Sequence, residues 1–112
     1  CGVTPEERAM WDGATNKHGL SSRMRVFYVA TLDPTTAAGY SKPPFCATGN
    51  ASPYVNYVVL SNSASSSTNP LAHEFGHILL DSGNHETPPN LMAPAGGTDL
   101  TPTQCVTVYG NA

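Results

Sequence analysis

Two stretches of the chain are dense in apolar and β-branched residues, and both predict strands. Residues 25–32 and 54–61 place apolar side chains on both faces of an extended backbone. That pattern is typical of strands in a sheet that is covered on both sides. The connection between them, residues 33–53, is rich in Pro, Gly, Ser and Thr, which predicts a long loop with one short strand near residues 45–48.

Signals for a helix start stand near both ends of the chain. Thr4-Pro5-Glu6-Glu7 combines a Thr cap, Pro at the first helical position and Glu at the third. It predicts a helix over residues 5–18 that Gly19 ends through a left-handed cap. Thr101-Pro102-Thr103-Gln104 repeats the capping-box pattern and predicts a short last helix to residue 109.

A further helix is predicted in the middle of the chain. Asn69-Pro70 supplies a cap and a first helical residue, so the helix should cover residues 70–82 and end at Gly83. Residues 84–97 are rich in Pro, Gly and Asn and lack periodicity, which predicts a loop. Together these elements predict an α+β fold with a twisted sheet.

Length, charge and hydropathy narrow the class of protein. The 112 residues fit one domain over residues 1–112, because folded units commonly have about 100 to 150 residues. No apolar run approaches the roughly 20 residues of a membrane span. The formal net charge of -3 argues against nucleic acid as a partner. All basic residues precede residue 43, so the later part of the chain is acidic. This charge asymmetry would suit a bound cation in the later part, but a solvated acidic surface explains it equally well.

Three cysteines in so short a chain indicate an oxidising compartment, so we expect a secreted or periplasmic protein with one disulfide. The sequence leaves the pairing open among Cys1, Cys46 and Cys105. Cys46 with Cys105 is favoured, because a terminal Cys1 is the easiest to leave out of a folded framework. Buried free thiols are the alternative.

The main candidate for chemistry is His73-Glu74-Phe75-Gly76-His77, inside the predicted middle helix. Residues four apart lie on one helix face, so both imidazoles can bind one zinc ion at Zn–N distances of about 2.0–2.1 Å. Glu74 stands beside them as a candidate general base. The helix can hold the two histidines rigidly through its apolar side, formed by Leu71, Phe75, Ile78 and Leu79. The plain alternative is that both are ordinary core or surface histidines.

Catalytic zinc commonly takes three protein ligands and leaves the fourth position open. His85 is the best third ligand, because Gly83 tolerates positive φ and lets the chain turn back toward the metal. Asp81, Glu86 and Asp99 are the other acidic candidates. Glu86 could also orient the His85 ring, but an exposed loop charge is the favoured interpretation.

Residues 73–94 resemble metzincin metallopeptidases, and the matrixin-like bacterial members most closely. In that family a helix carries His-Glu-x-x-His, a third His follows a Gly turn, and a Met-containing tight turn runs beneath the metal. The segment Asn90-Leu91-Met92-Ala93-Pro94 resembles this Met-turn, with Met92 as an apolar base and not a ligand, although Met92 could also simply fill a gap in a core. Leu80 stands where the family has the Gly, and the connection to His85 is two residues longer than usual.

The order of elements also resembles that family over most of the chain. The resemblance implies a small metzincin-like catalytic domain, in which residues 54–61 form the edge of the cleft and align an extended substrate. It implies a zinc-dependent endopeptidase that acts on peptide or protein substrates, and we expect a monomer. Two alternatives are a non-catalytic zinc module that binds a peptide or protein, and a zinc amidase acting on cell-wall peptides. Structural zinc sites usually fill all four positions with Cys and His, and no cysteine stands near these histidines.

Overall fold

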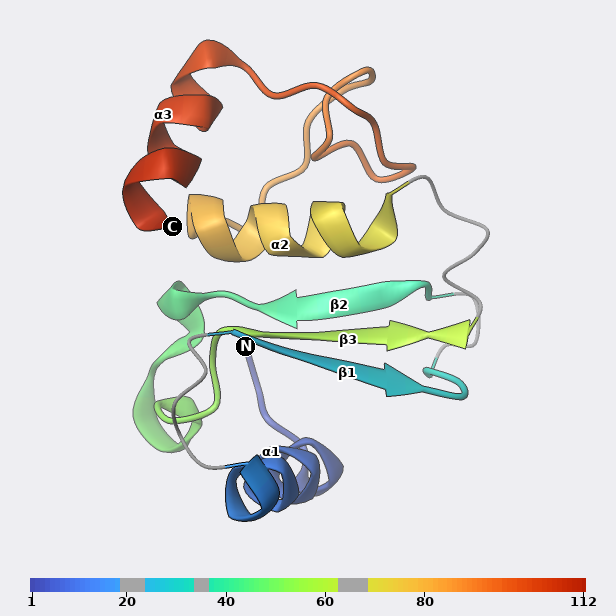
Figure 1. Cartoon of the computed structure of the whole chain (residues 1–112), viewed down its shortest axis with the longest axis vertical. Helices are drawn as coiled ribbons and strands as arrows, with labels where there is room; N and C mark the ends of the chain where they lie inside the picture. The colour runs from blue at the N-terminus through green and yellow to red at the C-terminus, as the bar shows by residue number, and fades with distance from the viewer. Residues whose placement is uncertain (19–23, 34–36, 63–68) are drawn as a thin grey trace.

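The computed structural model describes residues 1–18, 24–33, 37–62 and 69–112. Within them, three α-helices and a three-stranded mixed sheet form a small α+β domain, as the sequence predicts (Figure 1). Two short 3-10 helices, η1 and η2, lie between the second and third strands. The elements are, in order, α1 (Pro5–His18), β1 (Arg25–Val29), β2 (Gly39–Lys42), η1 (Pro44–Cys46), η2 (Gly49–Ala51), β3 (Tyr57–Ser61), α2 (Pro70–Leu80) and α3 (Pro102–Asn111).

Both capping boxes form as the sequence predicts. The Glu7 N–H donates to Thr4 Oγ1 at 3.2 Å, and the Thr4 N–H donates to the Glu7 carboxylate at 2.6 Å. At α3, Thr101 and Gln104 make the same reciprocal pair. The end predicted for α1 at Gly19 lies outside the described residues. Of the helices that the structure describes, none is long and apolar enough to cross a membrane.

The sheet has the order β1-β3-β2, with β3 parallel to β1 and antiparallel to β2. All five residues of β3 are buried, which explains their continuous apolar run. The expectation that residues 54–61 form the edge beside the cleft is therefore wrong, because β3 is central and, in the described sheet, β2 is the edge strand that contacts α2. The prediction of a short strand near residues 45–48 is also wrong. Pro43 and Pro44 have no N–H to donate to a sheet, and a 3-10 turn follows instead.

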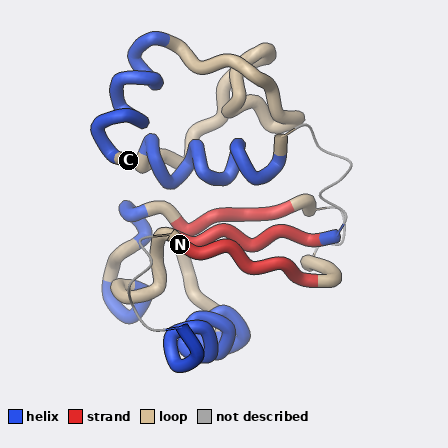
Figure 2. Tube along the Cα trace, viewed as in Figure 1, coloured by secondary structure: helices blue, strands red, loops and turns tan. Residues whose placement is uncertain are grey.

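Helix α1 covers one face of the sheet and α2 covers the other (Figure 2). Successive residues of a strand point to opposite faces. On β2, Ser41 accordingly donates a hydrogen bond to Glu74 of α2, whereas the next residue, Lys42, forms a salt bridge with Glu7 of α1. The core on the α2 side is built from Val58, Leu60 and Ile78, with Met24, Val26, Leu71 and Phe75 packed around them.

The α1 side holds a buried carboxylate, Glu7, which joins three elements. It accepts a hydrogen bond from the Tyr57 hydroxyl at 3.0 Å and lies 3.4 Å from the Lys42 ammonium. Burial by itself raises the pKa of Glu7. The net effect is nevertheless a pKa below the ordinary value, because the carboxylate is stabilised by the Thr4 N–H, the Tyr40 and Tyr57 hydroxyls and the Lys42 charge. This cluster ties α1 to β2 and β3.

The disulfide joins Cys1 to Cys46, so the expected pairing of Cys46 with Cys105 is wrong. The reason lies in the anchoring of the N-terminal segment. The Lys42 ammonium donates to the Gly2 carbonyl, which draws the first residues toward the end of β2 and the adjacent η1. Cys105 is an exposed free thiol on α3, which lies on the far side of α2 from the sheet (Figure 1). A disulfide is compatible with the expected extracellular setting.

Candidate metal centre

Helix α2 carries His73 and His77. It begins at Pro70, as the sequence predicts, but the role of the Asn69 side chain and the end of the helix differ from the prediction. Asn69 precedes the helix in a left-handed conformation (φ 53°), and its side chain donates to the Gly97 carbonyl instead of capping the helix. The helix ends at Leu80, and Asp81 supplies the left-handed cap with φ 48°, so the end predicted at Gly83 is wrong. Asp81 can hold this position because its carboxylate accepts the Phe45 N–H at 2.6 Å.

The imidazoles of His73 and His77 are oriented by backbone carbonyls. His73 Nδ1 lies 2.7 Å from the Leu91 carbonyl oxygen, and His77 Nδ1 lies 2.8 Å from that of Ser82. A carbonyl can only accept a hydrogen bond, so Nδ1 carries a proton in both rings. Metal-binding histidines commonly have such a partner for the other ring nitrogen.

When both rings are neutral, their Nε2 atoms carry lone pairs, and these two atoms face each other. The two Nε2 atoms are 3.2 Å apart. Two nitrogens bound to one tetrahedral zinc at about 2.0–2.1 Å would be separated by about 3.3–3.4 Å. Lone pairs at such a distance repel unless a cation lies between them, so this geometry fits a shared metal ion. Burial lowers the pKa of His77, and this effect outweighs the Ser82 carbonyl and Glu74, which both raise it. A lower pKa favours the neutral imidazole, which is the form that binds metals.

His85 completes a group of three, as the sequence predicts. Its ring centroid lies 5.3 Å from that of His73 and 5.1 Å from that of His77, and one ligand atom from each of the three residues lies within 4.8 Å of the others. His85 is exposed, whereas the two helical histidines are buried. The left-handed residue that redirects the chain after the helix is Asp81, so the expected role of Gly83, which has no positive φ, is wrong. The three histidines are therefore positioned to hold a metal ion.

The alternative acidic ligands are not part of this group within the described residues. The Asp81 carboxylate is bonded to Phe45, and that of Asp99 accepts from Thr98 Oγ1 at 2.8 Å. Glu86 is an exposed loop residue whose N–H donates to the Met92 carbonyl.

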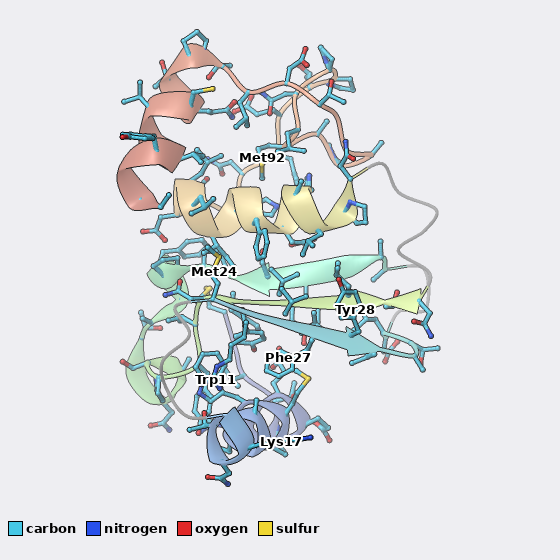
Figure 3. All side chains as sticks on the ribbon, viewed as in Figure 1. Trp11, Lys17, Met24, Phe27, Tyr28 and Met92 are labelled. Atoms are coloured by element: carbon cyan, nitrogen blue, oxygen red, sulfur yellow. A yellow bond between two sulfur atoms is a disulfide. The ribbon has the colours of Figure 1, made fainter. Side chains whose placement is uncertain are left out.

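Met92 lies against α2 (Figure 3), next to Gly76, which directly precedes His77 in the sequence. It is only 1% exposed, and a Cβ added at Gly76 would lie 2.3 Å from its sulfur. Gly76 thus leaves the space that Met92 fills. The hydrogen bonds that hold the loop around Met92 include Leu91 N–H to the Asp99 carbonyl at 2.6 Å and Asn90 Nδ2 to Gln104 Oε1 at 2.8 Å.

Glu74 lines the same cleft as the three histidines. The cleft has a volume of about 780 Å³ and is bordered by β2, η1, α2 and the loop after α2. The Glu74 carboxylate accepts a hydrogen bond from Ser41 Oγ at 2.8 Å. Ser41 was not foreseen from the sequence, since a four-residue strand of Gly, Tyr, Ser and Lys has no distinctive apolar pattern.

Comparisons of the chain with protein-family models, characterised proteins and solved structures find no match.

Proposed function

We propose that the chain is a zinc-dependent endopeptidase, with zinc held by His73, His77 and His85 and with Glu74 as general base. The observation that carries this proposal is the convergence of three imidazoles beside a carboxylate on the wall of an open cleft. Three protein ligands leave one position for water or substrate, which is typical of catalytic zinc and not of structural zinc. The metzincin-like character of the domain is part of the same proposal.

When bound, zinc would activate a water molecule and polarise the scissile carbonyl as a Lewis acid. Glu74 takes the proton from the attacking water and returns a proton to the leaving amine, so that one carboxylate serves as base and then as acid. The Leu91 and Ser82 carbonyls hold the His73 and His77 rings in one tautomer throughout.

Strand β2 is suited to bind the substrate backbone. One of its edges pairs with β3, and within the described residues no strand pairs with the other. Its residues line the cleft that Glu74 and the histidines share. An extended peptide can add to such an edge through main-chain hydrogen bonds, which supports a peptide or protein substrate.

The first test combines metal analysis with cleavage of a denatured protein. We expect one zinc per chain, loss of cleavage with a chelator and recovery when zinc is restored. Glu74→Ala should keep zinc and lose about 10²–10⁴-fold in kcat, as expected for a general base. Glu86→Ala, which removes a nearby exposed carboxylate, is the matched control and should keep both. Full activity in Glu74→Ala would refute the assigned role.

A second test addresses the metal ligands. His85→Ala should weaken zinc binding, whereas His18→Ala, which changes the only other histidine of the chain, should not. Zinc bound without any cleavage would favour the non-catalytic module, and cleavage confined to cell-wall peptides would favour the amidase.

A further inference from the structure

The hydrogen bond between Ser41 and Glu74 joins residues of two different elements across the cleft wall. Ser41 Oγ lies 2.8 Å from Glu74 Oε2, although the residues are 33 positions apart in the sequence. The carboxylate is an acceptor when ionised, so the serine hydroxyl is the donor. Hydrogen bonds to a charged acceptor are about twice as strong as those between neutral groups.

The fold brings the two elements close enough for this bond. Ser41 pairs in register with Val58 of β3, whose side chain belongs to the core under α2. Two positions before it, Gly39 lies on the same face of β2, and a Cβ there would come within 2.8 Å of the Val59 carbonyl oxygen and 3.7 Å of Glu74 Cγ. A Cβ at Gly39 would also lie 2.6 Å from Leu60 Cδ2, so the missing side chain lets β2 lie close to β3, while the distance to Glu74 Cγ is an ordinary contact. In this position of β2 the Ser41 hydroxyl meets the Glu74 carboxylate at hydrogen-bond distance.

A glutamate side chain has several rotatable bonds and costs about 1.5–2 kcal/mol of rotamer entropy when it is immobilised. In an open cleft it samples many positions unless a neighbour holds it. Ser41 occupies one carboxylate oxygen, and among the residues that the structure describes no group hydrogen-bonds the other, which can accept a proton. A misplacement of about 1 Å in a catalytic group can lower a rate by about 10²-fold.

We infer that Ser41 is a positioning residue that holds the Glu74 carboxylate in its working orientation. The inference rests on the proposed peptidase function. Ser41 does not touch the substrate in this role, since its effect on the reaction passes through Glu74. Its side chain points to the α2 face of the sheet, and the open backbone edge of β2 remains available to the substrate.

The test compares Ser41→Ala with Ser41→Thr, which restores a hydroxyl, and with Ser52→Ala, a control at an exposed serine in the turn after η2. We expect Ser41→Ala to lower kcat about tenfold with KM and zinc affinity within twofold of the wild type. Ser41→Thr should recover most of the lost kcat, and Ser52→Ala should match the wild type. In the Glu74→Ala background, Ser41→Ala should have no further effect on residual turnover, because the two residues act as a unit.

Crystal structures of the zinc-loaded wild type and of Ser41→Ala supply a readout that does not depend on activity. We expect one Glu74 conformer in the wild type and several in Ser41→Ala. An unchanged kcat, or a single unchanged Glu74 conformer in Ser41→Ala, would overturn the inference. A wild type that binds zinc without cleaving any peptide would refute the peptidase function instead, and the Glu74 conformers would still decide the role of Ser41.

Discussion

Replacing Gly76 with alanine should destabilise the protein, whereas the same change at Gly13 should stabilise it. Gly13 lies inside α1 and Gly76 inside α2, and neither has a positive φ. In a helix interior, alanine is favoured over glycine by about 1 kcal/mol. Propensity alone therefore predicts a gain in stability at both positions.

The surroundings of the two glycines reverse this expectation at one of them. A Cβ at Gly13 would meet nothing within 4 Å, but at Gly76 it would lie 2.3 Å from Met92 Sδ and 3.2 Å from Met92 Cε. Ordinary carbon contacts are at about 3.5–4.0 Å. Met92 is 1% exposed and cannot move into solvent. Overpacking of this kind costs about 1–3 kcal/mol, and taking the upper part of that range leaves a net loss of about 1–2 kcal/mol after the helix propensity is subtracted.

Thermal unfolding, with chelator and again with zinc, measures both effects. For a domain of this size 1 kcal/mol corresponds to about 4–8 °C in Tm, so Gly13→Ala should raise Tm by about 4–8 °C and Gly76→Ala should lower it by about 5–15 °C. Met92→Ala leaves a core cavity and is destabilising by itself, but the double variant with Gly76→Ala should lose about 1 kcal/mol less than the sum of the two single variants. A Gly76→Ala variant as stable as Gly13→Ala would refute the packing of Met92 on α2.

Three further predictions concern Glu7, on the α1 side of the sheet, and the cysteines. The pKa of Glu7 is below its ordinary value of 4.5, so its stabilising effect is present above that pH and is lost as pH falls through the lower folded-state pKa. Glu7→Gln should therefore cost about 1–3 kcal/mol in urea unfolding at pH 7, and a difference that stays constant down to pH 3 would contradict this. With the disulfide intact, a thiol reagent should label one cysteine in the folded chain, and Cys105→Ser should abolish the labelling. Reduction of Cys1–Cys46, which closes a loop of 45 residues, should cost about 2–4 kcal/mol, whereas labelling of Cys1 in the native chain would refute the pairing.

Local signals in the sequence were enough for the helices and for most of the candidate site. The capping boxes at Thr4 and Thr101 depend on residues three apart, and the histidines at positions 73 and 77 need only one turn of helix to share a face. These features were confirmed because short-range geometry on a helix is the same in nearly every fold. His85 was anticipated as the third member of the group, although the residue expected to turn the chain was Gly83 and the left-handed residue is Asp81.

Tertiary contacts between distant segments decided the rest. The short strand β2 has little strand propensity of its own and exists because it pairs with β3, which in turn becomes central and not an edge. Cys1 meets Cys46 because Lys42 and Glu7 anchor the N-terminal segment, and Asp81 ends α2 because Phe45 bonds its carboxylate. Ser41 reaches Glu74 only through the packing of β2 on α2. Interactions across tens of residues depend on which surfaces meet in space, and hydrophobic periodicity along one segment carries no information about its neighbours.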